Sequence, residues 1–252
     1  MPTSYATPPP PTVAIALQKQ YPECIATQTR QSRRLLPKLH RTPLLVLLVV
    51  VASAVFLAVT PWMMSEPDHR HLFGDDGPVE LISELLWVFL AGVAFGILRP
   101  IWQKGLAGAA LALACAAREA SWHKQFTDDE SVLKPGFFLD FQDVGIVPKL
   151  IAGVAVLILL WSVIIVSISC WQRASRDGWF RASWVQTAAI GLITLAISKV
   201  FDRAPGIITD FRDVDMEYPL RGVLYALEEG LELLLPIIFI IALITAHRSR
   251  GK

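Results

Sequence analysis

The sequence predicts an all-α protein, a polytopic bundle of six transmembrane helices with both chain ends in the cytoplasm. Hydrophobic residues make up 54% of its 252 residues, and the mean hydropathy is +0.49, which is too apolar for a water-soluble domain. The apolar residues form long runs without charge, and Lys and Arg gather beside alternate ends of these runs. Together these observations predict a multi-pass membrane protein.

Six spans are expected, because a helix needs about 20 apolar residues to cross the hydrocarbon core of a bilayer. Five runs reach this length directly: residues 44–64, 79–98, 150–170, 182–200 and 220–247. A further span is expected over residues 104–126, although Arg118 and Glu119 interrupt its apolar part. Without this span, two basic loops would lie on opposite sides of the membrane.

The distribution of basic residues predicts the orientation. More than half of the 23 Lys and Arg lie in residues 1–43, in the loops near Arg99 and Arg176, and in residues 248–252. Basic residues mark the cytoplasmic side, so residues 1–43 are expected to form a Pro-rich, disordered cytoplasmic tail and residues 248–252 a cytoplasmic end. The expected location is the bacterial inner membrane, with all but two of the 22 acidic residues facing the periplasm or the outer halves of the helices.

Ionisable residues inside the spans are the strongest functional signal, because each costs about 2.5 to 3.5 kcal/mol at a helix centre and is usually retained for a purpose. The candidate catalytic residues are Glu84, Arg118, Glu119, His123, Glu228, Glu229 and Glu232. All of them lie toward the predicted periplasmic side. We expect them to meet at one polar cavity that opens to the periplasm.

Helical spacing predicts which side chains share a face. One stripe in the second span joins Glu80, Glu84, Trp87, Ala91 and Phe95. In the third span, Glu119 and His123 continue a stripe of small residues, which favours close helix packing. A polar stripe in the fifth span contains Thr187, Gly191, Thr194, Ser198 and Asp202. The three glutamates of the last span fall within an arc of about 100°.

Three interpretations of the charged residues remain open from the sequence. A divalent metal would be held by Glu84, Glu119, His123, Glu229 and Glu232, as in carboxylate-rich helix bundles, and would serve an enzyme acting on a lipid-borne or small substrate. His69-x-His71 could add ligands, although such a pair is more often a solvated loop. Alternatively, the carboxylates carry protons or ions in a coupled transporter. The third interpretation is a structural network in which Arg118, Lys199 and Arg203 pair with carboxylates, without catalysis.

Other patterns limit the function further. The sequence contains no nucleophile elbow, P-loop or Gly-rich dinucleotide turn, and a net charge of +1 gives no support for a nucleic-acid partner. The expected partners are the lipid bilayer and a lipid or small-molecule ligand. Gly92-x-x-x-Gly96 is a candidate contact for a homo-oligomer, although such a pair usually packs within one chain.

One segment resembles a known group of proteins. The stretch Ala117-Arg-Glu-Ala-Ser-Trp-His-Lys124, followed by Phe126-Thr127, and the stretch Asp75-Asp-Gly-Pro-Val-Glu80 are similar to segments of uncharacterised multi-pass inner-membrane proteins of bacteria. The resemblance covers about the middle half of the chain. It implies the same membrane location and brings no activity with it.

Overall fold

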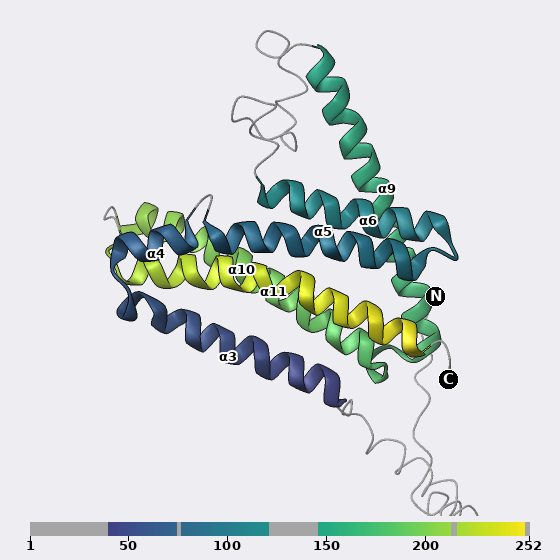
Figure 1. Ribbon diagram of the computed structural model, residues 1–252, viewed down its shortest axis with the longest axis horizontal. Helices are drawn as coiled ribbons and strands as arrows, with labels where there is room; N and C mark the ends of the chain where they lie inside the picture. Colours follow the sequence, from purple (N-terminus) through teal and green to yellow (C-terminus); the bar gives the residue numbers. More distant parts are fainter. Residues whose placement is uncertain (1–39, 75–76, 121–145, 213–215, 250–252) are drawn as a thin grey trace, which may run out of the picture. The chain divides into compact units, whose positions relative to one another are not determined.

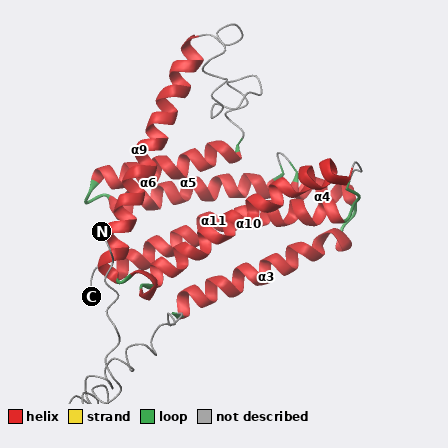
Figure 2. Ribbon diagram, turned by 180° about the vertical axis from the view of Figure 1, so that it is seen from behind, coloured by secondary structure: helices red, strands yellow, loops and turns green. Residues whose placement is uncertain are grey.

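The computed structural model describes residues 40–74, 77–120, 146–212 and 216–249 (Figure 1). All regular structure in these ranges is helical, as Figure 2 shows. The elements are α3 (Arg41–Met63), α4 (Glu66–Phe73), α5 (Pro78–Leu98), α6 (Trp102–Glu119), α9 (Ile146–Asp177), the 3-10 helix η1 (Trp179–Arg181), α10 (Ser183–Arg212) and α11 (Leu220–Arg248). The predicted all-α class is therefore confirmed for the described residues.

Helix α11 is the central element of the packing. It contacts α3, α4, α5 and α10, whereas α9 packs against α6 and η1. Helices α5 and α6 lie side by side and run in opposite directions (Figure 1). In α11 the buried residues occur on several sides of the helix, as expected for a helix enclosed by neighbours.

Small residues allow α3 and α11 to approach closely. A Cβ atom added at Gly222 would lie 3.2 Å from the Pro61 ring, and one added at Gly230 would collide with the side chain of Leu57. Ala226, between these glycines on the same face, is fully buried. Dispersion contacts between closely packed backbones drive association in a lipid environment, where the hydrophobic effect offers no preference between helix and lipid.

A second packed region joins α5, α6 and α11. Trp87 and Leu90 from α5, Ala112 and Ala116 from α6, and Leu235 from α11 form one buried cluster. The alanines in α6 provide the space that the Trp87 indole fills. This cluster fixes the position of the last turns of α6, which carry Arg118 and Glu119.

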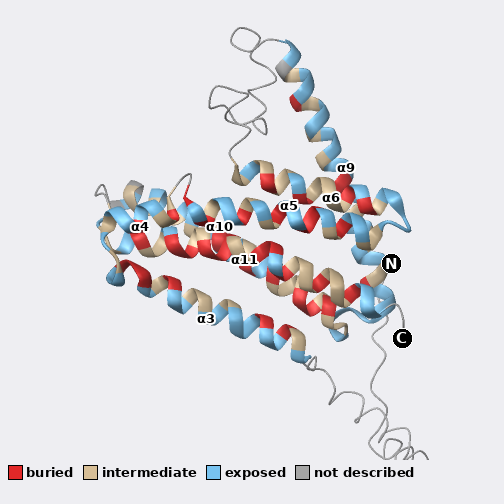
Figure 3. Cartoon of the chain, in the orientation of Figure 1, coloured by how far each residue is buried: buried red, intermediate tan, exposed pale blue. Residues whose placement is uncertain are grey.

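The outer surfaces of the helices are apolar (Figure 3). Five helical stretches of the described residues are long and apolar enough to cross a membrane: Arg41–Met63, Glu66–Leu98, Lys149–Asp177, Ser183–Thr209 and Leu220–Arg248. Exposed Leu, Ile, Val and Phe side chains would be unfavourable in water and are stable in lipid. Helix α6, with 18 residues, is not among the five.

Several helices differ from the predicted ranges, and α9, for example, extends over Ile146–Asp177 where residues 150–170 were expected. Residues Glu66–Phe73, expected in a loop, form α4, whose first turn is capped by the Ser65 hydroxyl accepting from the backbone N–H of Asp68. Helix α10 continues to Arg212 with Pro205 inside it, beyond the predicted end at residue 200. The predicted end of the third span, through residue 126, lies outside the described residues.

The buried face of α5 also differs from the predicted stripe. The buried residues include Val79, Ser83 and Trp87, whereas Glu84 is only half-buried and Phe95 is exposed. Gly92 and Gly96 are exposed, and a Cβ added at either would meet nothing within 4 Å. The expectation that this glycine pair packs within the chain is therefore wrong.

Candidate functional site

Glu232 is the centre of a network of charged groups inside the bundle. Its side chain is only 5% exposed. The Lys199 ammonium lies 2.5 Å from Oε1 and the Arg118 guanidinium 2.8 Å from Oε2. The Ser198 hydroxyl donates a hydrogen bond to Oε1 at 2.6 Å. We call these four residues the Glu232 network.

Three helices supply this network because each presents the required residue at the same depth. Glu232 lies twelve residues after Leu220 at the start of α11, about 18 Å along the helix axis. Ser198 and Lys199 are consecutive residues of α10, which packs along α11. Arg118 reaches the carboxylate from the last turn of α6. A buried carboxylate with two cations and a hydroxyl donor has the partners that burial of a charge requires.

Further carboxylates surround the network. Glu119 lies 3.7 Å from the Arg118 guanidinium, with its side chain 9% exposed, and Asp202 lies 3.5 Å from the Lys199 ammonium. Glu228 and Glu229 lie about one turn before Glu232 on α11. Glu119 and Glu232 both contact Arg118, whereas Glu228 and Glu229 line a cavity beside them.

A cavity of about 690 Å³ adjoins these carboxylates. Asp202 of α10 and Glu228 and Glu229 of α11 line it, together with His69 of α4. We call it the α4 cavity. The carboxylates of the cavity lie next to the Glu232 network, since Asp202 binds Lys199 and Glu228 acts electrostatically on both Asp202 and Glu232.

His69 has an unusual environment for a polar residue. It is 2% exposed, and its Nε2 atom has no hydrogen-bond partner among the described residues. Its ring packs against Phe73, with the ring centroids 4.8 Å apart. A buried polar atom without a partner costs about 1–3 kcal/mol. Such an atom beside a cavity is a candidate contact for a bound molecule or ion.

Helix α10 extends the polar region toward the other end of the bundle. Thr187, Thr194 and Ser198 of the predicted polar stripe are all buried. The Thr hydroxyls donate to backbone carbonyls one turn earlier, those of Ser183 and Ile190. Their lone pairs remain available to accept further hydrogen bonds. The stripe thus runs from Asp202 past Glu232 to Thr187.

One predicted site residue does not join the network in the structure. Glu84 is half-buried on α5, and no hydrogen bond or ion pair connects it to Glu119, Glu229 or Glu232 within the described ranges. His123 lies outside the described residues. Arg203, expected in a structural ion-pair network, is exposed, whereas Arg118 and Lys199 do pair with Glu232.

The predicted metal site is not supported. No group of three or more His, Cys, Asp or Glu in the part of the chain that the structure describes could hold a metal ion. The physical reason is that both oxygens of Glu232 are already bound to cationic side chains. A carboxylate that neutralises Lys199 and Arg118 is not free to serve as a metal ligand.

The sequence interpretation missed two features. His69 was grouped with a solvated loop, but the Ser-Glu-Pro-Asp sequence at residues 65–68 is a helix start that would have predicted α4. The sequence predicted that Lys199 pairs with a carboxylate, but the residues next to it along the chain did not indicate Glu232 as the partner. That pairing depends on how α10 and α11 pack.

The fold and this region define an all-helical protein with helices suited to a membrane and a charged network buried among them. No protein-family model, curated protein or solved structure matches the chain.

Proposed function

We propose that the chain is a multi-pass protein of the bacterial inner membrane with six spans and both ends in the cytoplasm. In this arrangement α6 is the third span. It is the least apolar candidate, but it runs antiparallel along α5, so a membrane that encloses α5 encloses α6 as well. Its buried alanines and its exposed Leu106 and Leu113 are consistent with a helix between protein and lipid.

We further propose that this protein transports protons or small cations, with the carboxylates beside the α4 cavity as their binding groups. The observation that carries this proposal is that three carboxylates, those of Asp202, Glu228 and Glu229, line the α4 cavity together. Closely spaced carboxylates in a medium of low dielectric require bound protons or cations to balance their charges. The Glu232 network has its own cations, whereas Glu229 depends on what enters the cavity.

The arrangement of the groups supports movement as well as binding. The carboxylates of the cavity lead through Asp202 and Lys199 to Glu232, and the buried hydroxyls of Ser198, Thr194 and Thr187 continue along α10. Between Asp202 and Thr187 the helix advances about 22 Å, most of the ~30 Å hydrocarbon core. Polar groups placed in this way are typical of ion and proton pathways in membranes.

An enzymatic function is the weaker candidate, because its predicted metal is not supported. The α4 cavity is lined by three carboxylates and by His69, whose Nε2 has no hydrogen-bond partner among the described residues, but a catalytic function would need a substrate that none of these groups specifies. Transport requires only that the cavity accept protons or cations, and the surplus of carboxylates meets that requirement.

The test is ion flux in proteoliposomes that contain the purified protein. Vesicles loaded with a pH-sensitive dye are exposed to an outward or inward gradient of protons, Na⁺ or K⁺, and internal pH and cation content are followed. We expect flux above that of protein-free vesicles, strongly reduced by Glu229→Gln. Glu66→Gln is the matched control, since Glu66 is an exposed carboxylate of α4 that pairs only with Arg70 in the described residues.

Two results would contradict the proposal. The first is flux equal to that of protein-free vesicles under every gradient. The second is flux that persists unchanged in both Glu229→Gln and Glu232→Gln, which would show that these carboxylates do not lie on the pathway.

A further inference from the structure

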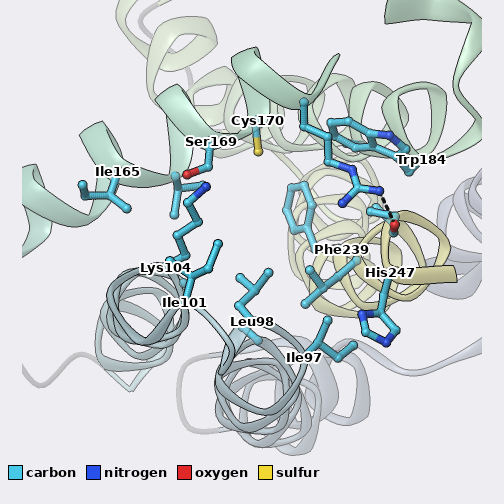
Figure 4. Close-up of a pocket in the computed structure, with 18 of the residues that line it drawn as sticks. Ile97, Leu98, Ile101, Lys104, Ile165, Ser169, Cys170, Trp184, Phe239 and His247 are labelled. Carbon is cyan, nitrogen blue, oxygen red and sulfur yellow. Dashed lines mark hydrogen bonds between the residues drawn. The ribbon is translucent and has the colours of Figure 1, made fainter. Parts of the chain in front are cut away.

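A second cavity, drawn in close-up in Figure 4, shares no lining residue with the α4 cavity. Its volume is about 550 Å³, and residues of α5, α6, α9, α10 and α11 line it. Most of its wall is apolar, with Leu98, Phe239 and Ile165 among the lining residues. None of the carboxylates of the Glu232 network or of the α4 cavity takes part. We call it the basic pocket.

Basic side chains are also part of the pocket lining. Lys104, Arg173, Arg176 and His247 all line it, and Asp177 is the single carboxylate among its described lining residues. Asp177 is already bound, because its Oδ2 accepts hydrogen bonds from Arg173 at 3.1 Å and from the Trp184 indole at 2.9 Å. Arg173 therefore balances Asp177, and the charges of Lys104 and Arg176 remain.

The two remaining cations are available for a ligand. The Lys104 ammonium has no hydrogen bond or ion pair within the described part of the chain, and the side chain is half-buried. Figure 4 shows it reaching from α6 toward Ser169 of α9. Arg176 is exposed and donates from Nε to the carbonyl of Gln172, which leaves its terminal nitrogens free of partners in the described residues. Placing an ammonium group beside apolar walls costs less free energy when an anion pairs with it.

The length of the pocket matches one leaflet of a membrane. Its lining residues on α9 run from Ile165 to Asp177, a distance of about 18 Å along the helix. Half of the hydrocarbon core of a bilayer is about 15 Å thick. The charged residues of α9, Arg173, Arg176 and Asp177, lie at one end of this distance, and less polar residues of the helix continue from there toward the middle of the bundle.

We propose that the basic pocket binds an anionic phospholipid, with its phosphate at Lys104 and Arg176 and one acyl chain along the apolar wall. Three features of the pocket favour this occupant over others. A soluble anion would leave the apolar wall uncovered. A zwitterionic lipid would place its own cationic group beside Lys104 and Arg176, which are already positively charged. The pocket also lies at the end of the bundle where the loops are rich in Lys and Arg, and anionic headgroups bind basic pockets between helices on that side.

The test uses the detergent-purified full chain, freed of lipid and titrated with phosphatidylglycerol or phosphatidylcholine of identical acyl chains. Native mass spectrometry counts the bound lipids and gives their dissociation constants. We expect one phosphatidylglycerol to bind more tightly than phosphatidylcholine. Because a basic residue near a membrane surface changes binding to anionic lipid by about 5-fold, Lys104→Gln combined with Arg176→Gln is expected to weaken phosphatidylglycerol binding by roughly 30-fold.

The matched control removes the same charge from the same end of the bundle. Arg99→Gln combined with Arg248→Gln changes two exposed cations that do not line the pocket, and this variant is expected to bind phosphatidylglycerol as the unchanged protein does. A third variant, Ser169→Trp, fills the pocket without removing charge and is expected to abolish the bound lipid. Circular dichroism establishes that each variant retains its helices.

The outcomes decide between the occupants. Selective binding of phosphatidylglycerol that is lost in Lys104→Gln/Arg176→Gln and kept in the control supports the proposal. Equal binding of both lipids, or equal loss in both double variants, would overturn it. Displacement of the lipid by inorganic phosphate alone would identify a free anion as the ligand. Crosslinking of a second chain through position 169 would identify a contact between two copies of the chain. Either result would also overturn the proposal of a bound phospholipid.

Discussion

Replacing Glu232 by Gln tests whether the buried ion pairs stabilise the bundle. The substitution keeps the size of the side chain and removes its negative charge. Lys199 and Arg118 then face each other without the carboxylate between them, and the Ser198 hydroxyl loses a charged acceptor.

The expected loss follows from the number and burial of these contacts. Hydrogen bonds between membrane helices contribute on average about 0.6 kcal/mol and at most about 1.7 kcal/mol each, so three contacts give roughly 2 to 5 kcal/mol. Removing one partner of a fully buried pair costs about 3–5 kcal/mol. The side chains of Arg118 and Lys199 are 49% and 33% exposed, and partial solvation lowers the cost. We expect Glu232→Gln to reduce the free energy of unfolding by about 2–3 kcal/mol.

The assay is unfolding in mixed micelles by increasing sodium dodecyl sulfate, followed by circular dichroism. Glu66→Gln is the control, because Glu66 and Arg70 form an ion pair of similar length, 2.6 Å, on an exposed surface with side chains 43% and 68% accessible. Exposed pairs of this spacing contribute about 0.3–0.5 kcal/mol.

The comparison of Glu232→Gln with Glu66→Gln shows whether burial strengthens an ion pair in this protein. If burial gives the Glu232 pairs their strength, the losses differ several-fold. Equal and small losses in Glu232→Gln and Glu66→Gln would refute the reasoning, since the same chemistry would then be worth no more inside the bundle than on its surface. In the combined variant Glu232→Gln/Lys199→Gln the two losses are expected not to add, because the residues are in contact.

Two further predictions concern packing and the α4 cavity. Gly230→Val is expected to lower the free energy of unfolding by about 1–3 kcal/mol, because a Cβ atom at this position collides with Leu57; the same detergent unfolding measures it, and an unchanged midpoint would show that α3 can move away freely. His69→Phe is expected to raise stability by about 1 kcal/mol, because it removes the buried Nε2 that has no partner in the described residues, and to lower cation flux in proteoliposomes. A loss of stability in this variant would mean that His69 is a structural residue.

The sequence predicted the helices well where long apolar runs determine them. The last helix begins at Leu220, as expected, and α5 begins at Pro78, one residue before its predicted start. Such runs have few alternatives in lipid, because unpaired backbone groups cannot remain there. Helix α4 was missed because it is short and charged, and only its cap residues indicate it.

The candidate site was predicted in part. Glu232 of the last span and Glu119 both contact Arg118, and the positions of Glu228 and Glu229 relative to Glu232 follow from the angles that a helix fixes between its own residues. Of the stripe chosen for α5, Trp87 and Ala91 are buried, whereas Glu84 is only half-buried and its neighbour Ser83 is buried. Neighbouring residues differ by about 100° around the helix, and only contacts between helices decide which of them faces the interior. The same contacts decide that Glu232 binds Lys199.

The central position of α11 has a consequence for how the protein assembles in the membrane. Helices α3, α4, α5 and α10 all precede α11 in the chain, and each packs against it. During synthesis these helices enter the lipid before their common partner exists, so α3 has no surface equivalent to Ala226 and Gly230 to pack on. All of these contacts can therefore form only after α11, which begins at Leu220, is present. Until then Arg118 of α6 and Lys199 of α10 lack the Glu232 carboxylate that both contact in the folded chain.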